Sequence, residues 1–219
     1  MSTVPTDHIA PPAVGVDFGG TFVKIGVCRG AELLETDEPV PTADHPGPDA
    51  LIRAMAERIA ILRARHPGIK AVGVGVPGLV DHGRGFVHVL TNVPGWSHIP
   101  LREILSAQTG LPVTVENDAN AMTYAEWRYG AARGLRNVVG LTLGTGVGGG
   151  MVLDGKMYRG SQFSAGEIGQ MSIQFDGVSG HYGNLGALEK YVGNQQIAEH
   201  AQRRYAQAGR HQEIGDCAP

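Results

Sequence analysis

Residues 13–28 read AVGVDFGGTFVKIGVC, and this stretch decides the fold. The apolar run 13–17 is typical of a short buried strand, and Phe18-Gly19-Gly20-Thr21 interrupts it with a glycine turn. From residue 22 to residue 28, Val or Ile occupies every second position, which is the period of a strand rather than of a helix. The sequence therefore predicts a chain that opens with strand, glycine turn and strand, and a third strand at 31–36.

The composition excludes several classes of protein. Of the 219 residues, 42% are hydrophobic and 18% are charged, a balance typical of a globular chain. The formal net charge of −3 gives no electrostatic reason to expect a nucleic-acid or membrane partner. Two cysteines, Cys28 and Cys217, cannot form a disulfide framework, so we expect a reducing, cytoplasmic location. Residues 1–12 are expected to be a disordered tail without a signal peptide.

The rest of the chain predicts helices that alternate with strands, which is the pattern of an α/β fold. We expect Asp49 to cap a helix whose apolar face runs from Leu51 to Leu62. Leu79–Pro100 is expected to be irregular. Further strands are expected at 71–76, 112–116, 137–143, 151–153 and 156–158, and further helices near 101–108, at 119–129 and, as one long helix, at 185–208.

A second glycine loop spans Gly144–Gly150, with five glycines in seven positions. Glycine turns free backbone N–H groups that can bind an anion, so two such loops can hold successive phosphates of one nucleotide. No P-loop pattern occurs in the sequence. Gly144, Gly146 and Gly149 match the spacing of a dinucleotide-binding motif, which would make the protein a nicotinamide-dependent oxidoreductase. A hairpin rather than a helix is expected after Gly150, so this alternative is weak.

Several polar residues have plain structural explanations that stay open. Asn117 and Asp118 can simply cap the helix that follows them. Glu167 and Glu189 can be solvated surface charges. Asn92 can be a turn residue before Pro94-Gly95.

Six segments, taken together and in this order, resemble the ROK family of sugar kinases and repressors. They are 17–24 (DFGGTFVK), 75–78 (GVPG), 92–96 (NVPGW), 116–121 (ENDANA), 143–150 (LGTGVGGG) and 166–169 (GEIG). The resemblance covers roughly residues 13–200. It implies an actin-like ATPase (ribonuclease H-like) fold with two lobes, residues 13–118 and 119–219. Family kinases usually run longer, so the second lobe is expected to be incomplete, in a fragment or in a degenerate member of the family.

The resemblance also implies a function, namely that of a glucokinase-like enzyme that transfers a phosphoryl group from ATP to a hexose hydroxyl. Asp118 matches the general base, and Asp17 is expected near Mg²⁺. The residues expected to bind the nucleotide are Asp17, Gly19, Gly20, Thr21, Lys24, Gly144, Thr145 and Gly146. The residues expected to bind the sugar are Asn92, Asn117, Glu167, Gln170 and Glu189.

The chain departs from the family pattern where many members bind a structural zinc ion through one His and three Cys. The His position is Gln170 here, and the three Cys positions are Gly180, Tyr182 and Ala187. His181 lies in the same region without a partner in the motif. We therefore expect no zinc site. Because Gln170 has both a donor and an acceptor, it can take over the contact of the missing His with the sugar.

An alternative function within the same family is sugar binding without catalysis, with a lost or weakened nucleotide site. The repressor interpretation is weaker, because only about a dozen residues precede the first strand, where repressors carry a helix-turn-helix. The sequence leaves open which sugar is used and whether the donor is ATP or polyphosphate. A homodimer also stays open.

Overall fold

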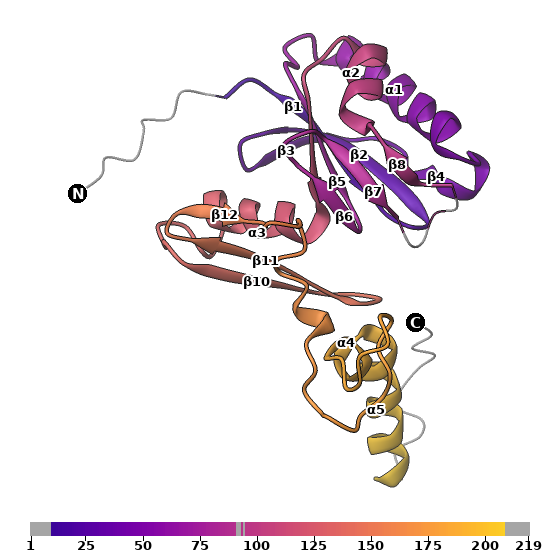
Figure 1. Ribbon diagram of the computed structural model, residues 1–219. Coiled ribbons are helices and arrows are strands. Elements are labelled where there is room, and N and C mark those ends of the chain that lie inside the picture. The colour runs from indigo at the N-terminus through magenta and orange to yellow at the C-terminus, as the bar shows by residue number, and fades with distance from the viewer. Residues whose placement is uncertain (1–9, 91–92, 94, 209–219) are drawn as a thin grey trace. The chain divides into compact units, whose positions relative to one another are not determined.

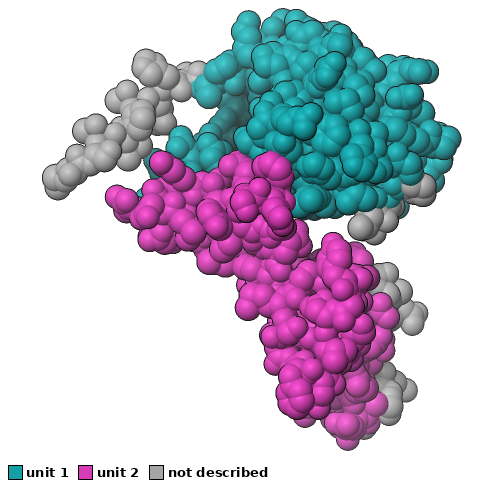
Figure 2. Space-filling view, in the orientation of Figure 1, with its two compact units in different colours: residues 1–134 teal, residues 135–219 magenta. Residues whose placement is uncertain are grey.

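The computed structural model describes residues 10–90, 93 and 95–208. The chain forms two compact units, Met1–Gly134 and Leu135–Pro219, which are coloured separately in Figure 2. The lobe boundary expected after residue 118 stays a prediction. Among the described residues, no helix is both long and apolar enough to cross a bilayer.

The first unit is built on a sheet of six strands (Figure 1). Its main order is β3-β2-β1-β5-β9, and the short β4 pairs with β2. The pairs β1–β2 and β2–β3 are antiparallel, whereas β5 runs parallel to both β1 and β9. The bounds are β1 (Ala13–Phe18), β2 (Phe22–Arg29), β3 (Glu32–Thr36), β4 (Val40–Pro41), β5 (Val72–Val76) and β9 (Val113–Asn117). The opening strand, glycine turn and strand predicted from the sequence are confirmed.

Two helices cover one face of this sheet. α1 (Pro48–Arg65) and α2 (Leu101–Thr109) pack against each other, and Val72, Val74 and Val76 are buried in the same apolar core as the inner faces of these two helices. Gly75 points the opposite way, because side chains alternate along a strand. A Cβ on Gly75 would lie 3.6 Å from Asp118 Cα, so only the first turn of α3 (Asp118–Tyr129) approaches this face, near the carboxyl end of β5.

The start of α1 differs from the prediction. Gly47 is the N-cap residue and Pro48 occupies the first helical turn, so Asp49 lies inside that turn and does not cap the helix. Proline suits this position because its missing N–H has no partner within a helix there. A short 3₁₀ turn, η1 (Thr42–Asp44), precedes the helix.

The prediction that Leu79–Pro100 is irregular is wrong. This segment contains a three-stranded antiparallel sheet of β6 (Leu79–Asp81), β7 (Phe86–Val89) and β8 (Ser97–Ile99). Each strand has only three or four residues, which is too short to show a period of two. Trp96 is buried and its ring lies 4.7 Å from that of Phe18, which ties this small sheet to the core.

The second unit begins with an antiparallel meander of β10 (Val138–Leu143), β11 (Val147–Leu153) and β12 (Lys156–Tyr158). The hairpin predicted at Asp154-Gly155 is confirmed, and both residues have a positive φ, as a tight two-residue turn requires. The glycine loop is shorter than predicted. It spans only Gly144–Gly146, because Gly148, Gly149 and Gly150 belong to β11.

The end of the described chain is not one long helix. After the 3₁₀ turn η2 (Ile168–Gln170), α4 (Glu189–Val192) and α5 (Asn194–Gln207) are separated at Gly193, whose backbone is extended. The sequence predicted one helix over 185–208. The observed helical segment begins four residues later, at Glu189, and is interrupted at Gly193. Glycine has the highest conformational cost of any ordinary residue in a helix, which explains where the break falls.

Candidate active site

The turn between β1 and β2 presents two charged side chains. Asp17 and Lys24 are cross-strand partners in the β1–β2 ladder, their charged atoms lie 3.5 Å apart, and their side chains are 61% and 70% exposed. Thr42 braces the turn, because its hydroxyl donates to the carbonyls of Gly20 (2.7 Å) and Thr21 (3.0 Å). A Cβ on Gly19 would lie 2.8 Å from the Phe22 carbonyl oxygen, so this closed turn requires a glycine there.

The junction of β9 and α3 holds Asn117 and Asp118 in different roles. The Asn117 side chain accepts from the backbone N–H of Asn120 at 3.0 Å and donates to the carbonyl of Gly78 at 3.1 Å, so Asn117 is the N-cap of α3. Asp118 is the first residue of the helix, and its carboxylate accepts from the Ala119 N–H at 2.8 Å. Asp118 is exposed to solvent on one side, but the surrounding protein atoms desolvate its carboxylate in part and raise the pKa of Asp118 above its ordinary value.

The sheet brings Asp17 and Asp118 to the same end of its parallel strands. Asp17 pairs with Gly75 and Gly75 with Glu116, and all three residues lie at the carboxyl ends of parallel strands. In open α/β sheets this end is where ligands bind. The negative charge of Asp17 is close enough to raise the pKa of Asp118 further, after the larger effect of desolvation.

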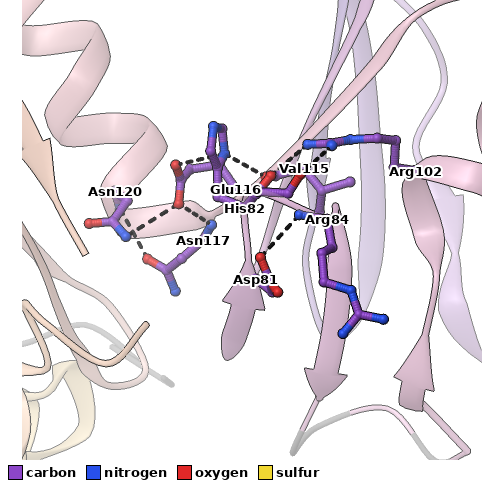
Figure 3. Close-up of polar contacts among 9 residues, drawn as sticks. Asp81, His82, Arg84, Arg102, Val115, Glu116, Asn117 and Asn120 are labelled. Carbon is purple, nitrogen blue, oxygen red and sulfur yellow. Dashed lines mark hydrogen bonds and ion pairs between the residues drawn. The ribbon is translucent and has the colours of Figure 1, made fainter. Parts of the chain in front are cut away.

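Behind this junction lies a polar cluster that the sequence did not single out (Figure 3). Glu116 Oε1 accepts from the Asn117 N–H at 3.0 Å and from the Asn120 side-chain amide at 3.3 Å. Glu116 Oε2 lies 3.2 Å from His82 Nδ1. No local pattern points to His82, because its contacts lie more than thirty residues away along the chain.

In the second unit, the β10–β11 turn is closed by a hydrogen bond from the Gly144 N–H to the Gly146 carbonyl. Glu189 reaches this turn, because its Oε2 accepts from the Val147 N–H at 3.0 Å. A Cβ on Gly146 would lie 2.3 Å from that oxygen, so Gly146 makes room for Glu189. The turn leads into a strand and not into a helix, which removes the structural context of a dinucleotide-binding motif.

The other residues expected to bind the sugar differ in their surroundings. Glu167 is exposed and precedes η2. The backbone carbonyl of Gln170 accepts from the Asn184 side chain at 2.7 Å, and Gln170 Oε1 is buried without a partner among the described residues. Glu189 Oε1 lies 3.2 Å from His181 Nε2. Asn92 lies outside the described residues.

No three His, Cys, Asp or Glu side chains within the described part of the chain are grouped so that they could hold a metal ion. The absence of a zinc site therefore stays a prediction. Gly180 and Ala187 occupy two of the positions at which the family pattern has cysteines. Ala187 is fully buried and pairs with Ser172, and the N–H of Gly180 donates to the Asn184 carbonyl at 2.7 Å. The segment is thus closed by backbone contacts.

Comparison with known proteins identifies similar sequences and similar structures. A family model described as the ROK family matches residues 13–216. The chain is 37% identical over 191 residues to a glucokinase of Streptomyces coelicolor, which is 87% of this chain and 59% of that protein. It is also similar to the crystal structure of a ROK family glucokinase from Streptomyces griseus in complex with glucose and AMPPNP, with 35% identity and a TM-score of 0.75 over 90% of this chain and 62% of that one.

A ROK family transcriptional regulator, a homologue of the Escherichia coli Mlc protein, is similar too. Its TM-score is 0.79 at 26% identity, over 90% of this chain and 50% of that one. The chain thus spans about three fifths of the length of the glucokinases to which we compare it. The expected actin-like ATPase fold is confirmed by these neighbours. The extent of the family match, together with the shared fold, establishes that this chain belongs to the ROK family.

Proposed function

We propose that this chain carries a sugar-kinase site that transfers the γ-phosphoryl group of ATP to a hexose hydroxyl, with Asp118 as the general base. The observation that carries the proposal is the position of the Asp118 carboxylate. It follows the carboxyl end of β9, near enough to Asp17 for that negative charge to contribute to its raised pKa. A carboxylate with a raised pKa holds a proton more readily, so it is a better acceptor for the proton of the attacking hydroxyl. The similarity to glucokinases supports the substrate class.

By resemblance to the family, we assign phosphate binding to the glycine turn of each unit. Backbone groups of Gly19–Thr21 and Gly144–Gly146 would bind phosphate oxygens, and Lys24 would contribute a positive charge. Asp17 fits a magnesium–nucleotide complex, because its carboxylate is exposed and Mg²⁺ usually keeps most of its waters and takes only one or two carboxylates. When bound, the metal ion supplies charge neutralisation at the phosphates.

By resemblance to the family, the residues that we propose to bind the sugar are Asn92, Asn117, Glu167, Gln170 and Glu189. Ionised glutamates can accept hydrogen bonds from two neighbouring sugar hydroxyls. Glu167 is the most open of them. Glu189 already contacts the Val147 N–H and His181, so we expect it to orient the β10–β11 turn as well as the sugar.

The proposal is tested by a coupled ADP-release assay with ATP, Mg²⁺ and a panel of hexoses. We expect Asp118→Asn to lower turnover by about 100-fold or more, since general-base catalysis contributes roughly 10²–10⁴-fold. The variant keeps a side-chain oxygen for the Ala119 N–H, so the affinity for glucose, measured by calorimetry, should survive. Asp154→Asn is the matched control, because Asp154 is 82% exposed in a tight turn that asparagine tolerates. Equal turnover in the Asp118→Asn and wild-type chains would refute the assignment.

A second candidate function is sugar binding without catalysis. The structural similarity to a ROK transcriptional regulator favours it. Titration of the chain with glucose and, separately, with AMPPNP discriminates between the two functions. Binding of glucose without any binding of AMPPNP would support the second candidate, and binding of both would support the kinase.

A further inference from the structure

The Glu116 carboxylate accepts from, or faces, three donor groups. It lies between the strand β9 and the turn that follows β6, and its side chain is 13% exposed. One oxygen accepts from the Asn117 N–H and the Asn120 amide, and the other faces the His82 ring (Figure 3). An ionised carboxylate has acceptor sites only, so it satisfies all three neighbours at once. A glutamine here would turn an NH₂ group toward at least one donor.

The geometry also fixes the tautomer of His82. Its Nδ1 lies 3.0 Å from the Val115 carbonyl oxygen and 3.2 Å from Glu116 Oε2, and both of these atoms are acceptors. Nδ1 must therefore carry a proton whether the ring is neutral or charged. His82 thus acts as a hydrogen-bond donor to the end of β9 in both protonation states.

The turn that carries His82 is itself held in place. Arg102 donates to the carbonyl of His82 at 2.5 Å and to that of Gly83 at 2.7 Å, and the backbone N–H of Arg84 donates to Asp81 at 3.0 Å. The His82 imidazole therefore extends from a turn that these hydrogen bonds hold in place. The contacts connect the small β6–β7–β8 sheet to the residues immediately before the proposed base.

We propose that His82 and Glu116 are positioning residues for Asp118. Glu116 holds the backbone of Asn117 and the side chain of Asn120, which flank Asp118 in the first turn of α3, and His82 holds Glu116. The inference rests on the proposed kinase function, because it assigns these two residues to the alignment of the base with the sugar hydroxyl. Neither residue contacts the substrate in this scheme.

The test compares His82→Ala with His82→Asn, because the asparagine amide can replace the Nδ1–H donor whereas alanine cannot. We expect His82→Ala to lower kcat by roughly 10- to 100-fold, the size of a small misalignment of reacting groups, with little change in the KM for ATP. His82→Asn should recover most of the lost kcat. Glu116→Gln should resemble His82→Ala.

A readout independent of turnover is the hydrogen exchange of the Asn117 amide, followed by NMR. The hydrogen bond to Glu116 should protect this amide in the wild-type chain and in His82→Asn, and protection should fall in His82→Ala and Glu116→Gln. Asp154→Asn should leave both kcat and protection unchanged.

The outcomes separate this inference from the function on which it rests. A wild-type chain without turnover overturns the kinase assignment and, with it, the positioning role. Wild-type turnover that His82→Ala retains in full overturns the positioning role alone. A kcat that falls equally in His82→Ala and His82→Asn also overturns it, because the donor would then be irrelevant.

Discussion

At the scale of single residues, two neighbours in sequence serve different purposes. Asn117 and Asp118 could both be explained from the sequence as helix caps. The structure confirms capping for Asn117 and places Asp118 inside the helix, where its carboxylate is not needed to satisfy the N-terminal N–H of Asn120. Asp118 is exposed to solvent and its carboxylate has a raised pKa, which makes it a candidate for chemistry.

The raised pKa of Asp118 predicts a cost in stability. A group whose pKa is higher in the folded state stabilises the fold at a pH below its unfolded value, and this contribution is lost as the pH rises through the folded value. At pH 7 the ionised Asp118 therefore destabilises the wild-type chain relative to Asp118→Asn. We expect the variant to have the higher urea midpoint at pH 7, and the difference to shrink as the pH falls toward about 4, the ordinary range of an aspartate.

This prediction is checked by urea unfolding of both chains at several pH values, followed by circular dichroism. Asp118→Asn that is less stable than wild type at pH 7 would contradict the partial desolvation of the ionised Asp118 carboxylate. A difference that stays the same at every pH would point to packing instead of charge.

Sequence reasoning at this scale found Asp17, Asn117 and Asp118 but not His82. The first three lie at or next to the carboxyl ends of strands, Asp17 just before a glycine turn, and these positions leave a local pattern. His82 acts through Val115 and Glu116, which are far away in sequence, so no window of neighbouring residues contains the signal.

At the scale of elements, most strands and helices were predicted close to their observed bounds, including the three-residue strand β12, but three short strands and one helix were not. The strands β1, β2, β5 and β9 and the helix α3 fall within a residue or two of their predicted bounds. The strands β6 to β8 were missed, because three or four residues do not define a period. The helix over 185–208 was predicted too long, because Gly193 was not taken as a break.

The glycines of the second unit predict a packing effect. A Cβ on Gly169 would lie 2.1 Å from the Val147 carbonyl oxygen, whereas a Cβ on Gly73 meets nothing within 4 Å. Gly169→Ala must therefore push η2 away from β11, and we expect it to destabilise this unit by about 1–3 kcal/mol. Gly73→Ala is the matched control and should be close to neutral.

The measurement is amide hydrogen exchange in β11 for both variants. Faster exchange there in Gly169→Ala alone is the expected result. If β11 is protected equally in Gly169→Ala and wild type, the close contact between η2 and β11 does not exist in solution. The sequence predicted that the five glycines from 144 to 150 form a loop. Gly149 instead allows close packing, because a Cβ there would lie 2.5 Å from the Gly166 carbonyl oxygen.

At the scale of the whole molecule, each unit contains the same small motif. Two antiparallel strands are joined by three residues, Gly19–Thr21 in the first unit and Gly144–Gly146 in the second. In the first unit, β5 and β9 extend this motif and bring Asp118 to the edge where Asp17 lies, across about a hundred residues of sequence. The sequence predicted the motif twice, and the resemblance to the ROK family implied that both turns serve one nucleotide.

The most direct test of this account is ³¹P NMR of the chain mixed with ATP, Mg²⁺ and glucose. We predict that a sugar-phosphate resonance grows in step with ADP, and that it is absent over the same time with Asp118→Asn. The account would be contradicted if the wild-type chain released only inorganic phosphate or no product, or if Asp118→Asn formed the sugar phosphate at the wild-type rate.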